Sequence, residues 1–549
     1  MTAAEAQEYV DISTIGIDNV SEAPAPLPSA SDKATVSYWM ATTSSKQLPI
    51  SLDEIPAQSD VVIIGSGITG VSCAYHLVNS LPNASSTEKQ KLRSITIVEA
   101  RSFCSGATGR NGGHLTAASA LAYTDLAANP NHLLGARLST LSNEEIKVQT
   151  GKVVQDILNF ETNTANHIRS ILKTENAEEQ VGFTDDRNWH LCFEHAEVDA
   201  FQDSLRQAGQ HQGMRRFVEQ VRRVPMEEVD ERMNQPLGIV AVYEIPGATL
   251  HPRKLVSLIY SCAQRSAAAN QISLNLVTDT PVHQVSVSRN ESILTTSRGD
   301  IKASYVVHAT NGYASHLLPH LSSPSTGIIP TRAQVVAVAP SSGKHLWGMG
   351  LSAGGGYEYG HQRPSTESTP PLYILGGGRE YATGREWGVA DDTSLNSQVS
   401  AFLHPYLAKT FPDSYGEKVT REWTGIMGYT KSKDPLVGPV TGSRGGKEYI
   451  AAGYSGHGMT RAFGCAQVIA DMMVADVNGE KWNNKSRGLP ECYLTEPAKA
   501  MLLEAAEVGK KIAAVGPADG MVEKNIDAEA RRQDEKLSQD SSASCCIVT

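Results

Sequence analysis

The sequence predicts an α/β protein whose first domain is a Rossmann-type domain built on a parallel sheet. Residues 61–64 form an apolar run of the kind that is buried on both faces in a parallel strand. Three glycines at the spacing G-x-G-x-x-G follow, beginning at Gly65, and a second apolar run, residues 95–98, ends at Glu99. A strand, a glycine turn, a helix and an acid at the end of the next strand are together typical of a dinucleotide-binding unit.

Each residue of the glycine turn has a physical reason for its position. Gly65 allows the tight turn, and Gly67, which lacks a Cβ atom, lets the backbone approach a pyrophosphate. Gly70 lets the following helix pack closely on the sheet. Ile68 and Thr69 open that helix, whose N-terminal N–H groups and partial positive charge favour phosphate. We expect all five residues to contribute to cofactor binding.

Glu99 is expected to hold a ribose hydroxyl pair, with Ala100 and Arg101 beside it. It lies further from Gly65 than the usual spacing of about 20 residues. The excess falls in residues 79–94, which are rich in polar residues and indicate a surface loop. Because the acid still ends a strand, the assignment holds.

A second glycine-rich segment, residues 105–114, follows Glu99 almost directly. Small residues at this density allow backbone amides to crowd against a flat or anionic ligand. The candidate cofactor-binding residues in the segment are Ser105, Gly106, Thr108, Arg110, Asn111, Gly112, Gly113 and His114.

These motifs, in this order, resemble the D-amino-acid-oxidase-type family of FAD-dependent oxidoreductases. More narrowly, the chain resembles the branch that includes γ-glutamylputrescine oxidase-like enzymes and fungal FAD oxidoreductases. The resemblance covers about residues 36–480 and is more specific for fold and cofactor than for substrate. It continues through residues 281–285, 305–312, 330–334, 373–379, 423–438 and 449–459.

The resemblance implies FAD as the cofactor, bound without a covalent link. Met427 stands near the position where sarcosine-oxidase-like relatives carry an attaching cysteine. Arg110 stands where dimethylglycine-dehydrogenase-like relatives carry an attaching histidine. Further cofactor-binding residues implied by the family's motifs are Val282, Ala309, Thr310, Asn311, Gly428, Gly453, Gly456, His457, Gly458 and Met459.

The implied architecture is a discontinuous FAD-binding domain together with a discontinuous α+β substrate domain on a large antiparallel sheet. We expect the ends of the chain to lie outside both cores, as a flexible N-terminus, an N-terminal arm, and a C-terminal helix with a flexible tail. The expected boundaries are 1–35 and 36–56 for the N-terminus and arm, 57–165, 246–329 and 423–484 for the FAD-binding domain, 166–245 and 330–422 for the substrate domain, and 485–549 for the C-terminal helix and tail.

Five residues are candidates for the catalytic site. Arg332, in a turn after a proline, fits either a clamp for a carboxylate or the flavin edge, or a surface or interdomain ion pair. Arg379 ends a Gly-Gly-Gly strand that forms a wall of the active site in the family. Tyr357 and Tyr359 alternate, so their side chains share a strand face, either as an aromatic wall or towards solvent. His457, between two glycines, is expected near N1 and O2 of the flavin or near the substrate. Three other histidines, His190, His195 and His251, are interpreted as ordinary surface or packed histidines.

The resemblance predicts FAD-dependent oxidation of a C–N bond in an amine or amino acid, by hydride transfer to flavin N5, with oxygen or another electron acceptor. One alternative within the enzyme class is a 2-hydroxy-acid or polyol dehydrogenase. An alternative of another class is a non-catalytic flavin-binding or assembly protein.

Composition and sequence patterns limit the partners and the compartment that we expect for this protein. A net charge of -11 and a pI near 5.8 argue against nucleic-acid binding. The eight cysteines show no zinc-binding spacing, so no metal is expected. The sequence contains neither an apolar run of about 18 residues nor a signal-peptide pattern, which predicts a cytoplasmic protein. The sequence leaves the oligomeric state open.

The last four residues, from Cys546 to Thr549, fit the C-a-a-X pattern for prenylation. Cys545 offers a site for a second lipid, and two lipids anchor a protein far better than one. This predicts that a fraction of the protein is attached to a membrane through Cys546. The alternative is an unmodified tail with two chance cysteines.

Overall fold

The computed structural model describes residues 16–81, 92–288, 291–341, 347–365, 371–442, 447–484 and 488–503. Contacts divide the chain into a unit Met1–Lys499 and a unit Ala500–Thr549. The fold and the site described below lie in the first unit.

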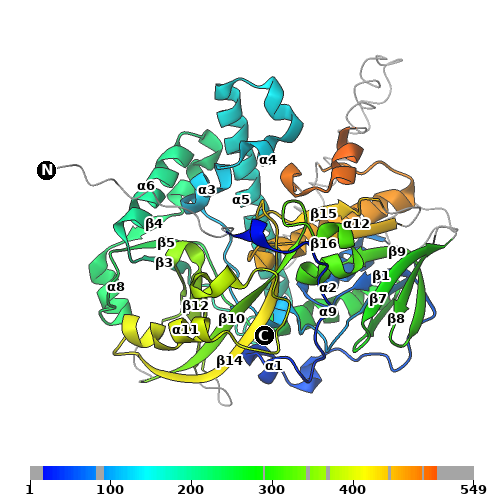
Figure 1. Ribbon diagram of the computed structural model, residues 1–549, viewed down its shortest axis with the longest axis horizontal. Helices are drawn as coiled ribbons and strands as arrows, with labels where there is room; N and C mark the ends of the chain where they lie inside the picture. Colours follow the sequence, from blue (N-terminus) through cyan, green and yellow to red (C-terminus); the bar gives the residue numbers. More distant parts are fainter. Residues whose placement is uncertain are drawn as a thin grey trace, which may run out of the picture. The chain divides into compact units, whose positions relative to one another are not determined.

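A parallel sheet forms the core of the predicted cofactor domain (Figure 1, right). Six of its eight strands have the order β15-β16-β9-β1-β2-β6, and all neighbours in this order are parallel except β15, which is antiparallel to β16. The other two strands, β8 (Glu291–Thr296) and β7 (Val282–Ser288), extend the sheet from β9 as antiparallel neighbours. The predicted Rossmann-type sheet is thereby confirmed. The strands are β1 (Gln58–Ile64), β2 (Ser94–Val98), β6 (Ser273–Val277), β9 (Gly299–His308), β15 (Leu436–Pro439) and β16 (Lys447–Ala452).

The two faces of this sheet are covered differently because side chains alternate along each strand. Val62 packs with Val306 and with Leu294 of the meander β7 (Val282–Ser288) and β8 (Glu291–Thr296) on one face. The other face carries helices that pack on one another in the order α9, α2, α12 and α5. These helices are α2 (Ile68–Ser80), α5 (Asn143–Thr174), α9 (Pro252–Ala269) and α12 (Gly458–Asn478).

A second sheet, which like the first has eight strands, forms the substrate domain (Figure 1, left). Its strand order is β14-β10-β13-β12-β11-β3-β5-β4. The strands are β3 (Asn188–Cys192), β4 (Arg222–Val224), β5 (Ala241–Ile245), β10 (Ile329–Pro340), β11 (Gly350–Ala353), β12 (Glu358–Gln362), β13 (Tyr373–Gly376) and β14 (Tyr415–Tyr429).

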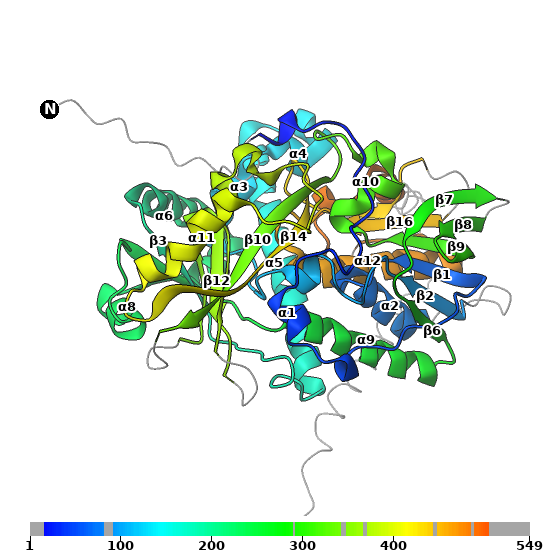
Figure 2. The ribbon, with the colours of Figure 1, turned by 60° about the horizontal axis from the view of Figure 1, so that its bottom comes forward.

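The sheet is antiparallel, as expected for the substrate domain, except at one pair of neighbours, β3 and β11, which are parallel. Parallel neighbours require a long crossover connection. The chain supplies one by passing through the cofactor domain between these two strands. The predicted boundary between residues 422 and 423 also falls inside β14, which pairs with β10 from Tyr429 to Tyr415. The strand is therefore shared by the two predicted segments (Figure 2).

Shorter helices surround the second sheet and the loops that join the domains. On one sheet face Trp189 and Leu191 enter a core with residues of α8 and α11. On the other face Cys192 and Tyr243 pack against Phe201 of α6. The helices not yet located are α1 (Tyr38–Ala41), α3 (Tyr123–Ala127), α4 (Pro130–Leu134), α6 (His195–Gly209), α7 (Arg215–Glu219), α8 (Met226–Met233), α10 (Ala314–Leu317) and α11 (Ser397–Thr410).

Residues 16–35, which we call the N-terminal strap, pack on the body of the unit and do not extend freely as predicted (Figure 2, dark blue). Ile17 is 1% exposed and packs against Trp387 and Tyr429. The N–H of Ala25 donates to Ser315 Oγ over 2.9 Å. The low hydrophobicity of this segment predicts disorder, but a few buried apolar residues and backbone hydrogen bonds fix it.

The C-terminal predictions are mostly outside the described part of the chain. Residues 496–503 are helical and lie within the range 485–549, where a C-terminal helix is expected. The rest of that helix, Cys545 and Cys546 lie beyond the described residues, so prenylation stays a prediction. Within the part of the chain that the structure describes, no helix has the length and apolar character needed to cross a bilayer.

Candidate active site

A single cavity of about 790 Å³ runs between the two sheets and collects most of the predicted site residues. It begins at the glycine turn after β1 and continues to the cavity-facing side of the substrate sheet. All predicted cofactor-binding residues line it except three, which are Gly70, Ser105 and Gly453.

The turn between β1 and α2 has the geometry of a phosphate cradle. Gly65 adopts φ 111°, and a Cβ atom there would meet the Ala309 carbonyl oxygen at 2.7 Å. Gly70 serves packing, because its Cβ atom would lie 1.9 Å from the Gly65 carbonyl oxygen. At Gly67 the nearest atom to a Cβ would be Thr108 Oγ1 at 3.2 Å. The open side of Gly67 therefore faces the cavity, as backbone approach to a ligand requires.

Glu99 is held in place by hydrogen bonds from its own domain. Its Oε2 accepts from the N–H of Ser66 over 2.9 Å and from Ser66 Oγ over 2.7 Å, and its Oε1 accepts from Arg101 N–H over 3.0 Å. The carboxylate lines the cavity and keeps lone pairs available, which suits ribose hydroxyls.

The glycine-rich loop is tied to both domains. Thr108 Oγ1 accepts from the N–H of Ile68 over 3.1 Å, which joins the loop to the start of α2. Trp39 Nε1 donates to the Asn111 carbonyl over 2.6 Å, and Trp423 Nε1 donates to the Arg110 carbonyl over 2.8 Å. The two indoles hold this loop in position along the cavity.

Two buried arginines of this region share one carboxylate. Arg101 Nη1 lies 2.8 Å from Asp392 Oδ2, and Arg110 Nε lies 3.4 Å from the same oxygen. Burial, partly offset by Asp392, lowers the pKa of Arg110 to about 10, so both guanidiniums stay charged at neutral pH. One carboxylate for two cations leaves a positive excess beside the cavity, which favours an anionic diphosphate.

The other end of the cofactor region is formed by the start of α12. His457 is the N-cap of this helix, and residues 456–459 line the cavity. Burial, followed by the nearby Arg461 guanidinium, lowers the pKa of His457 to about 4. A neutral imidazole and a helix N-terminus therefore face the cavity, and the helix N-terminus favours negative charge.

Glu161 and Arg461 form a buried ion pair that sequence reasoning missed. Arg461 Nε lies 2.7 Å from Glu161 Oε1, and both side chains are almost fully buried. Glu161 Oε2 accepts from Ala118 N–H over 2.8 Å and from Thr460 Oγ1 over 3.1 Å. The pair thus joins α5, α12 and the wall at Ala118. The sequence does contain a sign of this pair, because Glu161 lies four residues after Ile157 and therefore on the apolar face of α5.

The substrate side of the cavity is a chamber with apolar walls. Its polar residues include Asn188, His190 and Ser352 of the second sheet, and Asp125 of α3. His190 therefore lines the chamber, whereas the sequence indicates an ordinary packed histidine. The apolar wall consists of Leu121, Leu126, Ile157, Phe201 and Ile245.

Four of the five predicted catalytic residues line the cavity: His457, Arg379, Tyr357 and Tyr359. The Arg379 guanidinium lies 4.3 Å from the Trp387 ring centroid, 5.0 Å from that of Tyr429 and 5.5 Å from that of Tyr357. Aromatic faces attract a guanidinium and orient it. Tyr359 lies against the glycine-rich loop, because a Cβ atom at Gly112 would meet its ring at 2.4 Å.

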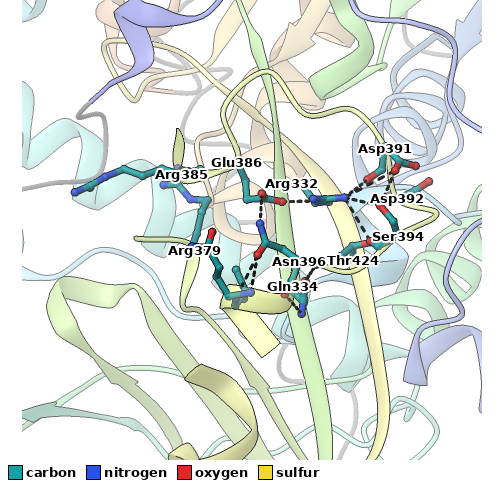
Figure 3. A network of polar contacts seen from close by, with 12 residues as sticks. Arg332, Gln334, Arg379, Arg385, Glu386, Asp391, Asp392, Ser394, Asn396 and Thr424 are labelled. Atoms are coloured by element: carbon teal, nitrogen blue, oxygen red, sulfur yellow. Dashed lines mark hydrogen bonds and ion pairs between the residues drawn. The ribbon is translucent and has the colours of Figure 1, made fainter. Parts of the chain in front are cut away.

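Arg332 does not line the cavity, and Figure 3 shows it in a network of polar contacts with its neighbours. Its guanidinium pairs with Glu386, and Nη1 donates to Ser394 Oγ over 2.8 Å. The structure favours an ion pair over a clamp, but this pair is buried and lies inside the substrate domain, and it is neither at the surface nor between domains as predicted.

The sequence predicts no metal site, yet the fold gathers two sets of ligand-type side chains. These are His190 with Cys192 and Glu197, and His132 with Asp434 and Cys492. In each set the histidine nitrogen and a carboxylate oxygen are 2.8 Å apart. Two ligands that each lie about 2 Å from a tetrahedral ion are separated by more than this, so the pairs have hydrogen-bond geometry.

The cavity fits FAD on its own geometry. The glycine turn after β1, the carboxylate of Glu99 and the buried arginines Arg101 and Arg110 follow one another along it. The buried hydroxyls of Thr116 and Thr310 line it and have no hydrogen-bond partner among the described residues. Glu99, the glycine turn and the N-terminus of α12 would hold the cofactor. The fold and the site thus define a dinucleotide-binding flavoprotein with a separate substrate chamber.

Comparison with known proteins agrees with this class. Residues 60–472 match the model of the FAD dependent oxidoreductase family (DAO), and the chain belongs to this family. It is 23% identical over 426 residues to a probable oxidoreductase OrdL of Rhizobium meliloti, covering 76% of this chain and 83% of the relative. Over 96 residues, 18% of this chain and 21% of the relative, it is 32% identical to the gamma-glutamylputrescine oxidoreductase of Escherichia coli.

Solved structures show the same fold. Glycine oxidase from Geobacillus kaustophilus superposes with a TM-score of 0.54 at 16% identity, covering 77% of this chain and 95% of that one. Iminodiacetate oxidase from Chelativorans gives a TM-score of 0.54 at 18% identity, covering 76% and 95%. The protein is therefore an FAD-dependent oxidoreductase, and the predicted family, fold class and cofactor are confirmed.

Proposed function

We propose that this protein oxidises the C–N bond of an amine or an amino acid and that molecular oxygen is the electron acceptor. FAD, when bound, supplies the chemistry by accepting a hydride at N5 from the carbon next to nitrogen. The observation that carries the proposal is the continuity of the cavity from the cofactor cradle into the apolar chamber.

The chamber residues supply orientation and exclude water. An ammonium group must lose a proton before its carbon can be oxidised, because the nitrogen lone pair supports the positive charge that develops. Apolar walls such as Leu126 and Phe201 lower the pKa of a bound amine, since burial disfavours the charged form. Arg379, oriented by Trp387 and Tyr429, offers a cation for a substrate carboxylate.

The names of the relatives support the same chemistry. Glycine oxidase, iminodiacetate oxidase and an L-proline dehydrogenase share this fold, and all are named for nitrogen-bearing substrates. At identities of 19% or less these likenesses carry the fold, and the substrate class of this chain is the proposal.

The test is anaerobic mixing of the purified holoprotein with glycine, L-proline, putrescine, n-hexylamine and benzylamine, and with lactate and glycerol as hydroxyl counterparts. Bleaching of the flavin band by at least one nitrogen compound, and peroxide release after oxygen is admitted, is the expected result. Bleaching by lactate or glycerol alone would replace the proposal with alcohol oxidation. Re-oxidation by an artificial dye but not by oxygen would refute the proposed acceptor.

Absence of a covalent flavin link is part of the same proposal. Met427 and Arg110 line the cavity. The resemblance to the family places them where relatives carry an attaching cysteine and an attaching histidine, and neither methionine nor arginine supplies such a nucleophile. Acid precipitation is expected to release all yellow colour into the supernatant. A coloured pellet would contradict this.

A further inference from the structure

A chain of directed hydrogen bonds crosses the wall of the substrate chamber. Asn188 Nδ2 donates to Ser352 Oγ over 3.0 Å, and Ser352 Oγ lies 3.0 Å from His190 Nδ1. His190 Nε2 lies 2.8 Å from Glu197 Oε1, which also accepts from Gly355 N–H over 2.7 Å. His190 and Glu197 are 6% and 5% exposed, so the chain is shielded from bulk water.

The partners assign the direction of every proton in this chain. An ionised carboxylate only accepts hydrogen bonds, so Glu197 requires the proton of His190 on Nε2. Nδ1 of His190 is then a bare acceptor, and Ser352 must donate its hydroxyl hydrogen to it. The N–H of Asn188 occupies one lone pair of Ser352 Oγ and leaves the other for a group in the chamber. The hydroxyl, the imidazole and the carboxylate are hydrogen-bonded in the same order as in a catalytic triad.

The chain lies on the face of the sheet that borders the chamber. Asn188, His190 and Ser352 all line the cavity. In the register of the sheet, Ser352 pairs with His190 on one side and with Tyr359 on the other. Neighbouring strands are about 4.8 Å apart, and Tyr359 contacts the glycine-rich loop at Gly112. The hydroxyl of Ser352 is therefore one strand away from the residue that borders the cofactor region.

We propose that Ser352, His190 and Glu197 form a proton relay that deprotonates the ammonium group of the substrate. This rests on the proposed amine oxidation. An N–H bond of the ammonium breaks and its electron pair stays on nitrogen. The proton joins Ser352 Oγ while the hydroxyl hydrogen of Ser352 moves to His190 Nδ1. A neutral amine and an imidazolium result, and total charge is conserved. Glu197 stabilises the imidazolium. Ser352 is the residue that touches the substrate, His190 takes up the proton from Ser352, and Glu197 positions His190.

Other titratable groups surround the relay, so their protonation also affects how the rate of flavin reduction depends on pH. Glu358 has its pKa raised to about 9 by burial and by its hydrogen bond with Glu380, so it is protonated at neutral pH and adds no charge beside Glu197. The groups that face the relay from neighbouring elements are Cys192 of β3, Tyr243 of β5, Arg223 of β4, Glu358 and Tyr359 of β12, Glu380 after β13, Tyr357 and His114.

The test measures the limiting rate of anaerobic flavin reduction against pH, with the nitrogen compound of the named panel that bleaches the wild-type protein. In the wild type this rate rises with pH as the bound amine loses its proton. In Ser352→Ala and His190→Gln the rate at pH 7 is expected to fall about 100-fold, a typical contribution of general base catalysis. The midpoint of the profile moves to higher pH, and the rates converge with the wild type at pH 10, where the amine is neutral without help.

Glu197→Gln is expected to lie between the wild type and Ser352→Ala, because an amide keeps the shape but loses the charge that holds the imidazolium. Ser204→Ala is the matched control: this buried α6 hydroxyl bonds Thr124 Oγ1 over 2.6 Å outside the relay. Ser204→Ala should therefore keep the wild-type pH profile of flavin reduction.

Outcomes separate the two hypotheses. If the wild-type flavin is not bleached by any nitrogen compound of the panel, amine oxidation fails and the relay fails with it. If the wild type is bleached but Ser352→Ala and His190→Gln keep the wild-type pH profile, the relay alone is refuted. A uniform loss at all pH values, with lower flavin content, would show a structural role and would also overturn the relay.

Discussion

At the scale of single residues, the glycine turn after β1 separates packing from ligand binding. Gly70 faces protein backbone, whereas Gly67 faces the cavity. The motif in the sequence already predicts these different tasks, and the contacts that a Cβ atom would make at each glycine agree with them. The same difference applies to Arg332, which forms an ion pair, and Arg379, which lines the cavity.

Substituting these glycines tests the difference. Gly67→Ala is expected to fold with a near-normal melting temperature but to lose FAD, because its Cβ atom fills the approach to the pyrophosphate. Gly70→Ala is expected to fold poorly, since its Cβ atom would lie 1.9 Å from a backbone oxygen. Circular dichroism and flavin content measure both. Gly209→Ala is the control, because its Cβ atom would meet nothing within 4 Å. Full flavin content in Gly67→Ala would contradict the cradle.

The buried pair of Glu161 and Arg461 gives a second prediction at this scale. Glu161→Ala leaves the Arg461 guanidinium buried, with its remaining carboxylate, Asp434, at 3.7 Å. Removing one partner of a buried pair costs about 3–5 kcal/mol of unfolding free energy. Asp185→Ala, in the more exposed pair with Arg169, should cost less than about 1 kcal/mol. Denaturant unfolding of the holoproteins compares them, and equal effects would refute the structural weight given to Glu161.

At the scale of elements, the sequence predicts what is encoded locally. The β1–α2–β2 unit follows from apolar runs and glycine spacing, and the structure confirms it. The neighbours of β3 could not be predicted, because β11 lies some 160 residues further along the chain and no local pattern specifies the pairing. The composition of the N-terminal strap predicts a flexible segment, because few of its residues are apolar. A segment that docks through only a few apolar residues has the same composition as a disordered segment, so composition does not distinguish the two.

The N-terminal strap is predicted to help retain FAD. Leu27 and Pro28 line the cavity between two anchors, Ala25 at α10 and Ser31, whose Oγ accepts from the N–H of Ser102 over 3.1 Å. Leu27→Ser should speed FAD release about tenfold, because a leucine side chain contributes roughly 1.5–3 kcal/mol when buried. Recovery of free-flavin fluorescence after dilution measures release.

The control for the strap is Val36→Ser. Val36 is 47% exposed and lies outside the cavity wall. Similar release rates for Leu27→Ser and Val36→Ser would exclude a part for the strap in cofactor retention. Circular dichroism of both variants shows whether the fold itself is preserved.

At the scale of the whole molecule, buried histidines set the response to acid. Burial lowers the pKa of His114 and of His457 to about 4, and it holds the pKa of His251 and of His361 well below the usual value. The folded protein keeps these rings neutral, whereas the unfolded chain protonates them below a pKa of about 6.5. Glu358 opposes them, because its pKa is raised to about 9 and its folded form holds the extra proton.

The unfolding free energy is therefore expected to fall as pH is lowered from 6.5 to 4. Each buried histidine contributes about 1.4 kcal/mol per pH unit in this window, and Glu358 cancels about one of the four above pH 4.5. His251→Asn should flatten the slope by about 1.4 kcal/mol per pH unit and still cap α9, since asparagine is a good N-cap. The exposed His283→Asn is the control. A wild-type stability that is flat from pH 6.5 to 4.5 would refute this assignment.

The N-terminal strap also bears on how the holoprotein is assembled. Its residues touch Ser315 of the cofactor domain and Trp387 of the substrate domain, and Leu27 and Pro28 close part of the cavity wall. The strap is synthesised before these partners, which lie hundreds of residues further along the chain, so we expect it to dock only on a nearly finished fold. Until it docks, the part of the cavity wall formed by Leu27 and Pro28 is open to FAD. Cofactor loading and the docking of the strap are therefore expected to be coupled events in maturation.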